Sequence, residues 1–114
     1  MKSSKPYLEH ILQECEFLME KSEGIGYDNF IKDPVLVRAF IRSLEIIGEA
    51  VKNLSGGFRE KYPEIPWKEI AGMRDKLIHE YFGVNYEIIW KTIMKEVPEL
   101  KIKIEEIMRN EGWR

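Results

Sequence analysis

The residues best suited to chemistry lie in one stretch of the chain, from Arg74 to Tyr81. An arginine guanidinium can hold a phosphate through two parallel hydrogen bonds. A histidine, whose pKa lies near neutrality, can give or take a proton. Arg74 and His79 therefore suit metal-free cleavage of a phosphodiester bond, with Arg74 holding the phosphate while negative charge builds on it. An arginine and a histidine five residues apart are more often structural than catalytic, so this pair alone does not establish a nuclease.

The pattern predicts that one helix carries this stretch, beginning at Pro66 and ending at Gly83. At about 100° per residue, Arg74 and Tyr81 fall almost on one line, within an apolar stripe of that helix. Tyr81 on its own would be interpreted as core packing. Because an unpaired buried charge is costly, we expect Arg74 to meet an anion, a carboxylate or an open cleft.

His79 is expected on the flank of the same helix, about 140° from Arg74. Gly72 shares that flank and could let another backbone approach, and Asp75 is placed to hold a ring nitrogen of His79. On this geometry Arg74 and His79 of one subunit diverge too far to hold one small phosphate. Two copies of the helix meeting across a two-fold axis could bring both pairs to one shared cleft.

Length and composition predict a single folded, soluble domain spanning residues 1–114, with 44 % hydrophobic and 33 % charged residues. The formal charge of −2 argues against binding nucleic acid through bulk electrostatics, although a small basic cleft is compatible with it. Neither a membrane-spanning run nor a secretion signal is evident, so we expect a cytoplasmic protein with no membrane contact.

Metal and thiol chemistry are not expected. Two histidines and one cysteine cannot supply a zinc cluster of the usual spacing, and the carboxylates form no recognisable set, so no metal and no cofactor are predicted. Cys15 lies on an apolar helix face, which favours a buried, inert thiol.

Apolar residues repeat at three- and four-residue spacing through most of the chain and predict an all-α bundle of four to five helices. Alternation at Leu100–Ile104 could indicate a strand, but no other segment offers a partner for it, so a helix is preferred. Glu45 and Glu49 favour a solvated charged face, with Arg42 and Lys52 as compensating cations; alternatively, one of these glutamates receives Arg74. The expected helices run from Pro6 to Ser22, from Pro34 (capped by Asp33) to Leu54, through a short turn at Phe58–Tyr62, from Pro66 to Gly83, from the cap Asn85 to Val97, and from Pro98 to Asn110.

Four segments resemble one known family, in order and at near-normal spacing. They are Leu44–Ala50, Tyr62–Trp67, Arg74–Gly83 and Val97–Leu100. From Pro34 to about Leu100 the chain resembles the HepT-like branch of the HEPN superfamily, the toxin half of HEPN/MNT (type VII) toxin–antitoxin pairs. The family's signature is Arg, four residues, His, one residue, Tyr, and Arg74, His79 and Tyr81 match it.

The resemblance implies an all-α homodimer that cleaves RNA as a metal-independent endoribonuclease, with Arg74 and His79 as catalytic residues. It also implies a partner, a small MNT-type nucleotidyltransferase antitoxin that neutralises the toxin by attaching AMP to Tyr81. The branch often has Asn after the arginine, where this chain has Asp75, a supporting position. A carboxylate there would favour protonated His79 and repel phosphate. A second class of function therefore stays open: a catalytically weak binding subunit that docks the nucleotidyltransferase and helps hold its substrate.

Overall fold

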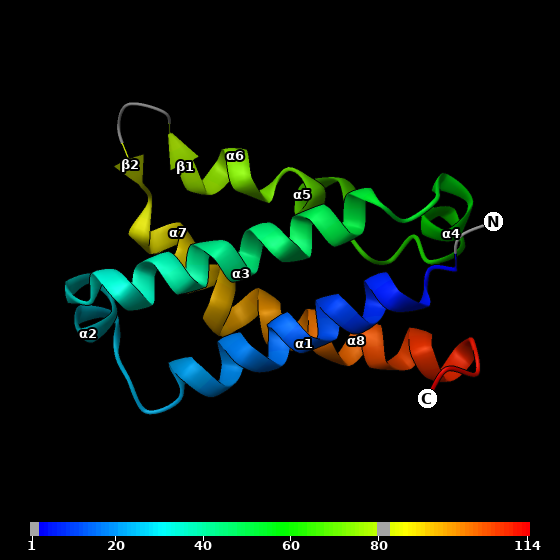
Figure 1. Cartoon of the computed structure of the whole chain (residues 1–114), viewed down its shortest axis with the longest axis horizontal. Helices are drawn as coiled ribbons and strands as arrows, with labels where there is room; N and C mark the ends of the chain where they lie inside the picture. Colours follow the sequence, from blue (N-terminus) through cyan, green and yellow to red (C-terminus); the bar gives the residue numbers. More distant parts are fainter. Residues whose placement is uncertain (1–2, 80–82) are drawn as a thin grey trace.

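The computed structural model describes residues 3–79 and 83–114, and for Arg74, Ile78 and His79 it describes the backbone alone. Three long helices lie side by side: α1 (Lys5–Ser22), α3 (Pro34–Lys52) and α8 (Val97–Asn110), with α1 packed against both others (Figure 1). This arrangement confirms the predicted all-α class. The shorter elements are α2 (Tyr27–Lys32), α4 (Gly56–Lys61), α5 (Trp67–Ala71), α6 (Met73–Leu77), α7 (Tyr86–Lys91), the π-helical turn η1 (Thr92–Glu96), and the two-residue strands β1 (Ile78–His79) and β2 (Gly83–Val84).

Side-chain caps fix where several helices begin, because the first amides of a helix lack partners inside it. The Asp33 carboxylate accepts hydrogen bonds from the Val35 and Leu36 amides, both at 3.1 Å, immediately before Pro34 opens α3. The Asn85 side chain caps α7 in the same way. Both caps confirm the sequence predictions. Ser55 likewise caps α4, where its side chain accepts a hydrogen bond from the Phe58 amide.

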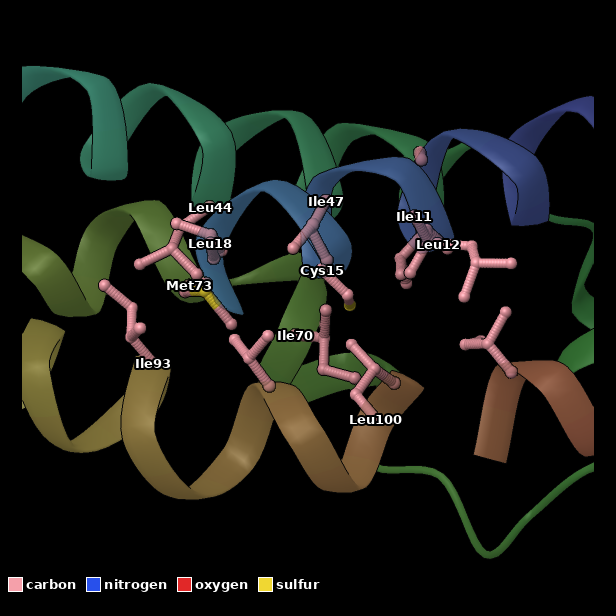
Figure 2. Close-up of a cluster of buried hydrophobic side chains, with 14 of the residues drawn as sticks. Ile11, Leu12, Cys15, Leu18, Leu44, Ile47, Ile70, Met73, Ile93 and Leu100 are labelled. Carbon is pink, nitrogen blue, oxygen red and sulfur yellow. The ribbon is translucent and has the colours of Figure 1, made fainter. Parts of the chain in front are cut away.

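The core forms where the apolar faces of α1, α3, α5, α6, η1 and α8 meet (Figure 2). Leu44 and Ile47 from α3 point into the same cluster as Ile70 from α5. Cys15 of α1 is fully buried there, and desolvation raises the pKa of its thiol to about 12, with Glu14 and Glu16 adding to the shift. A thiol in this state is inert at physiological pH, as predicted.

The C-terminal helices differ from the prediction of two helices separated at Pro98. The chain continues without a break from α7 through η1 into α8. Pro98 lacks an amide N–H, and its ring would clash with the carbonyl four residues earlier in a regular helix. The π-turn opens the backbone there, and the Val97 N–H bonds to the Thr92 carbonyl instead. Leu100–Ile104 lies within α8, so the preference for a helix over a strand is confirmed.

A glycine on α3 sets how closely the segment that follows can pack. A Cβ added to Gly48 would lie 3.1 Å from the carbonyl oxygen of Ile70 and 3.6 Å from that of Ala71. The backbones of α3 and α5 are therefore in near contact, and the missing side chain of Gly48 permits this close packing. Because α6 and β1 follow α5 directly, this contact helps to position the Arg74–His79 stretch.

We expect Gly48→Ala to lower the free energy of unfolding. Overpacking against a backbone oxygen costs about 1–3 kcal/mol. The gain in helix propensity from glycine to alanine returns only about 1 kcal/mol. Urea denaturation would measure the difference. Gly57→Ala in α4 is the matched control, because a Cβ there meets no atom within 4 Å. If Gly48→Ala were as stable as the control, the close contact between α3 and α5 would be refuted.

Candidate active site

The predicted helix from Pro66 to Gly83 is wrong. In its place the structure has two one-turn helices, α5 and α6, which are separated by Gly72. The strand β1 follows α6. His79 pairs with Gly83 and Ile78 with Val84 in an antiparallel hairpin, and the Asn85 amide donates to the Leu77 carbonyl at 3.0 Å.

The local sequence is compatible with the hairpin, although it does not by itself select the hairpin over a helix. Glycine is a poor helix former, so Gly72 weakens the helix at its centre. Gly83 has φ +77°, a left-handed conformation that other residues rarely adopt, and it allows β2 to turn back beside β1. β-branched Ile78 and Val84 favour the extended pairing. The glycine was interpreted in the sequence as a helix stop, whereas it belongs to a hairpin.

The three predicted site residues have different positions. The Arg74 backbone lies in α6, the His79 backbone lies in β1, and Tyr81 lies outside the described residues. Because helix geometry ends at Leu77, the 140° helical angle expected between Arg74 and His79 does not apply, and the expected line from Arg74 to Tyr81 ends outside the described residues. The same applies to the expected four-residue helical contact between Asp75 and His79. The geometric argument for a dimer that rested on that angle therefore fails.

Helix α6 is fixed to the core through one face and open on the other. Met73 and Leu77, four residues apart, are both buried, whereas Asp75 and Lys76 are exposed. This spacing places the buried pair one turn apart on the same side of the helix. The carboxylate of Asp75, the residue next to Arg74, therefore faces solvent. An anionic substrate that approached Arg74 would meet this negative charge.

α3 packs against α5 and α6, β1 continues along the same side (Figure 1), and the exposed face of α3 carries charged residues. Glu49 bonds to Lys52 at 3.4 Å on this face, and both side chains are exposed, as the solvated interpretation predicts. Arg42 was expected to act as a second compensating cation. In the described part of the chain it forms no ion pair, and the same is true of Arg38 one turn earlier. Both arginines are exposed.

An aromatic cluster that the sequence did not predict joins α2, α3 and α7, the helix that follows β2. Phe30 of α2 is fully buried and stacks on Trp90 of α7 at 5.2 Å between ring centroids, and on Phe40 of α3 at 5.5 Å. Tyr86, the first residue of α7, meets Phe30 edge-on at 6.3 Å. The α2 helix was not predicted, because two aromatic residues three apart, Tyr27 and Phe30, are too weak a periodic signal to identify a six-residue helix.

On its other side, α6 borders a cavity of about 340 Å³ between α3, α5 and the η1–α8 segment. Its floor is apolar, and its rim carries both signs of charge. The lining residues are Leu44, Ile47, Pro66, Glu69, Ile70, Met73, Lys76, Thr92, Glu96, Val97, Glu99, Leu100 and Lys103. A polyanion such as RNA needs a mainly basic surface, so this cavity is a poor substrate site.

Two features are absent from the part of the chain that the structure describes. No group of three or more His, Cys, Asp or Glu side chains there is arranged to hold a metal ion. No helix among residues 3–79 and 83–114 has both the length and the apolar character needed to cross a membrane.

Comparison with known proteins finds a family match over most of the chain. Residues 11–107 match the family described as "Ribonuclease HepT-like". A protein of Caldanaerobacter subterraneus subsp. tengcongensis named "Putative RNase TTE0752" is 70 % identical over 111 residues, which cover 97 % of this chain and 99 % of that protein.

More distant relatives carry similar names. "Putative RNase MJ0127" of Methanocaldococcus jannaschii is 47 % identical over 96 % of this chain and 90 % of its own length. "Probable ribonuclease HepT" of Thermococcus cleftensis is 46 % identical over 95 % of this chain and 98 % of its own length. No solved structure matches the chain.

Proposed function

We propose that this chain, which belongs to the HepT-like ribonuclease family, is an endoribonuclease that cleaves RNA without a metal ion. One observation carries the proposal: the family match spans the stretch that contains Arg74, His79 and Tyr81. The position of this stretch in the fold also supports it. The Arg74 and His79 backbones belong to consecutive elements, α6 and β1, and the close contact at Gly48 helps to hold these elements on α3.

In the proposed reaction the 2′-hydroxyl of RNA attacks the adjacent phosphorus, and the 5′-oxygen of the next nucleotide leaves. His79 moves the proton from the nucleophile or to the leaving oxygen. Arg74 holds the non-bridging phosphate oxygens through its bidentate fork and stabilises the charge that develops on them. The products are a 2′,3′-cyclic phosphate, or its hydrolysis product, and a 5′-hydroxyl end.

The biological role that we propose is that of the toxin in a type VII HEPN/MNT toxin–antitoxin pair acting in the cytoplasm. The partner is an MNT-type nucleotidyltransferase that neutralises the toxin by transferring AMP to Tyr81. Two peptide units separate Tyr81 from His79, so their Cα atoms lie at most about 7.6 Å apart. A nucleotide attached to Tyr81 would therefore carry its phosphate into the neighbourhood of the proposed catalytic histidine.

We further propose a homodimer whose interface includes Gly72 and the hairpin residue His79. Gly72 is exposed at the break between α5 and α6, where its missing side chain leaves room for a second copy of the chain. A two-fold axis there would place both Arg74–His79 stretches at one cleft and double the positive charge of that cleft on an acidic protein.

Light scattering tests the homodimer, and we expect a mass of two chains. Ordinary interface affinities hold a dimer together at concentrations of roughly tens of micromolar. Gly72→Gln, which adds a long side chain at the proposed interface, should shift the mass towards one chain. Gly57→Gln on α4 should leave the mass unchanged. A monomeric wild-type protein under these conditions would count against a cleft that two subunits share.

The ribonuclease itself is tested by incubating purified protein with single-stranded RNA in the presence of EDTA. We expect cleavage to continue and to leave cyclic phosphate ends that mass spectrometry detects. Cleavage that stops in EDTA and returns with Mg²⁺ would refute the metal-free mechanism. Asp75 favours the second candidate, a weak binding subunit, because an exposed carboxylate beside Arg74 opposes phosphate binding. Absence of cleavage by any preparation would support that candidate.

A further inference from the structure

Two arginines on α3 take part in none of the contacts described above. Arg38 and Arg42 are four residues apart, so they stand one turn from each other on the same face of α3. Both are exposed, and neither forms a hydrogen bond or an ion pair within the described part of the chain. Like charges at this spacing repel each other and destabilise a helix slightly. Some other exposed cations are compensated, such as Lys52 by Glu49 and Lys61 by Glu111.

The position of this pair follows from how α3 packs. Gly48 touches the carbonyls at the end of α5, and the chain then runs through α6 and β1 towards the N-terminal end of α3 (Figure 1). Arg42 and Arg38 precede Gly48 by about two and three turns, so they lie along the part of α3 that borders α6 and β1. Both arginines are exposed, and their long side chains can extend beyond the surface of the helix.

We infer that Arg38 and Arg42 bind the phosphates of RNA that flank the bond cleaved at Arg74 and His79. This inference rests on the proposed function. The chain carries a net charge of −2, so an RNA strand needs a local group of cations to stay bound. Two uncompensated guanidinium groups one helical turn apart offer such a group. They also offset the exposed Asp75 carboxylate, which would otherwise repel the strand from α6.

Binding should be measured in the His79→Ala background, so that the RNA remains intact. We expect Arg38→Gln and Arg42→Gln each to raise the Kd for a fluorescent single-stranded RNA by about tenfold, the typical value of a charge-assisted contact. The slope of log K against log salt concentration should become shallower by about 0.7 for each arginine that is lost. In the active protein the same changes should raise KM and leave kcat within about twofold.

Arg109→Gln is the matched control, because it removes an equal charge from an exposed arginine near the C-terminal end of α8, away from the hairpin. Its Kd and salt slope should equal those of the parent. If Arg38→Gln and Arg42→Gln behave as Arg109→Gln does, the inference is wrong and the two arginines are solvated surface. If either variant changes the oligomeric mass, the arginine serves an interface and the inference is also wrong.

Failure of the inference differs from failure of the proposed function. If only the inference is wrong, the wild-type protein still cleaves RNA and His79→Ala still abolishes that cleavage. If the protein binds RNA through these arginines but never cleaves it, the inference stands for a binding subunit and the ribonuclease proposal falls.

Discussion

We expect His79→Ala to reduce the rate of RNA cleavage by about a hundredfold to ten-thousandfold, the usual contribution of a positioned general acid or base. The imidazole is the group in this stretch whose proton exchanges near neutral pH. Without it, the 2′-hydroxyl and the leaving oxygen must exchange protons with water. The measurement is the initial rate of cleavage of a single-stranded RNA in EDTA.

The chain supplies its own control for this prediction. His10, its other histidine, is exposed on α1. His10→Ala should cleave RNA at the wild-type rate. Circular dichroism should be unchanged in both variants, because neither change removes a described core residue. Equal loss of activity in the two variants, or full activity in His79→Ala, would refute the assignment of His79.

We expect the role of Arg74 to require the planar shape of its guanidinium group as well as its positive charge. Arg74→Lys keeps the positive charge but loses the planar fork that binds two phosphate oxygens together, so we expect most of the activity to be lost. Wild-type activity in this variant would mean that a point charge is sufficient and that Arg74 does not hold the phosphate bidentately. The pair of variants thus separates proton transfer from phosphate binding.

The sequence predicted those helices whose ends carry local signals, such as a capping side chain or a proline. Asp33 and Pro34 begin α3 because a carboxylate cap and a proline both suit the first turn, and the apolar spacing of α1 and α3 reproduces their buried faces. These signals are local, so they can be interpreted without knowledge of the partners. The helix α2, only six residues long, was missed because it is too short for periodicity to identify it.

The geometry of the site could not be predicted in the same way. Residues from Arg74 to Leu77 continue the helical pattern, and nothing local forbids extension to Gly83. The hairpin exists because Ile78 and His79 find partners in Val84 and Gly83, and because the Asn85 amide bonds to Leu77. Such pairing decides between helix and strand only after the chain has turned back. The identities of the site residues could be proposed from the sequence, whereas their relative directions could not.

The aromatic cluster and the unpaired arginines could not be predicted from the sequence for a different reason. Phe30 meets Phe40 and Trp90 from distant parts of the chain, and no local pattern predicts that contact. Arg38 and Arg42 were visible as a charged stripe, but only the structure shows that no carboxylate among the described residues compensates them. Charge patterns become informative when their partners are known.

The largest regulatory effect should come from Tyr81→Phe. After co-expression with the partner nucleotidyltransferase, the intact mass of the wild-type protein should rise by whole AMP units, and peptide mapping should place them on Tyr81. Phenylalanine keeps the ring and lacks the hydroxyl that would accept the nucleotide in the proposed modification. We therefore expect Tyr81→Phe to escape modification and to remain toxic in cells that also produce the partner.

The physical reason is the short chain between Tyr81 and His79. AMP attached there adds bulk and a negative phosphate within reach of the site, where it can occupy the Arg74 fork and repel an incoming RNA backbone. Tyr86→Phe is the matched control, since Tyr86 is an exposed tyrosine at the start of α7, just beyond β2. That variant should be modified and silenced as the wild type is.

Two results would overturn this account of control. If the partner still neutralises Tyr81→Phe, control runs through simple complex formation, and the tyrosine has no regulatory hydroxyl. If Tyr81→Phe loses RNA cleavage without the partner, the phenol contributes to catalysis or folding, and a circular dichroism spectrum distinguishes the two. The AMP mechanism requires that Tyr81→Phe be fully active without the partner and resist neutralisation when the partner is present.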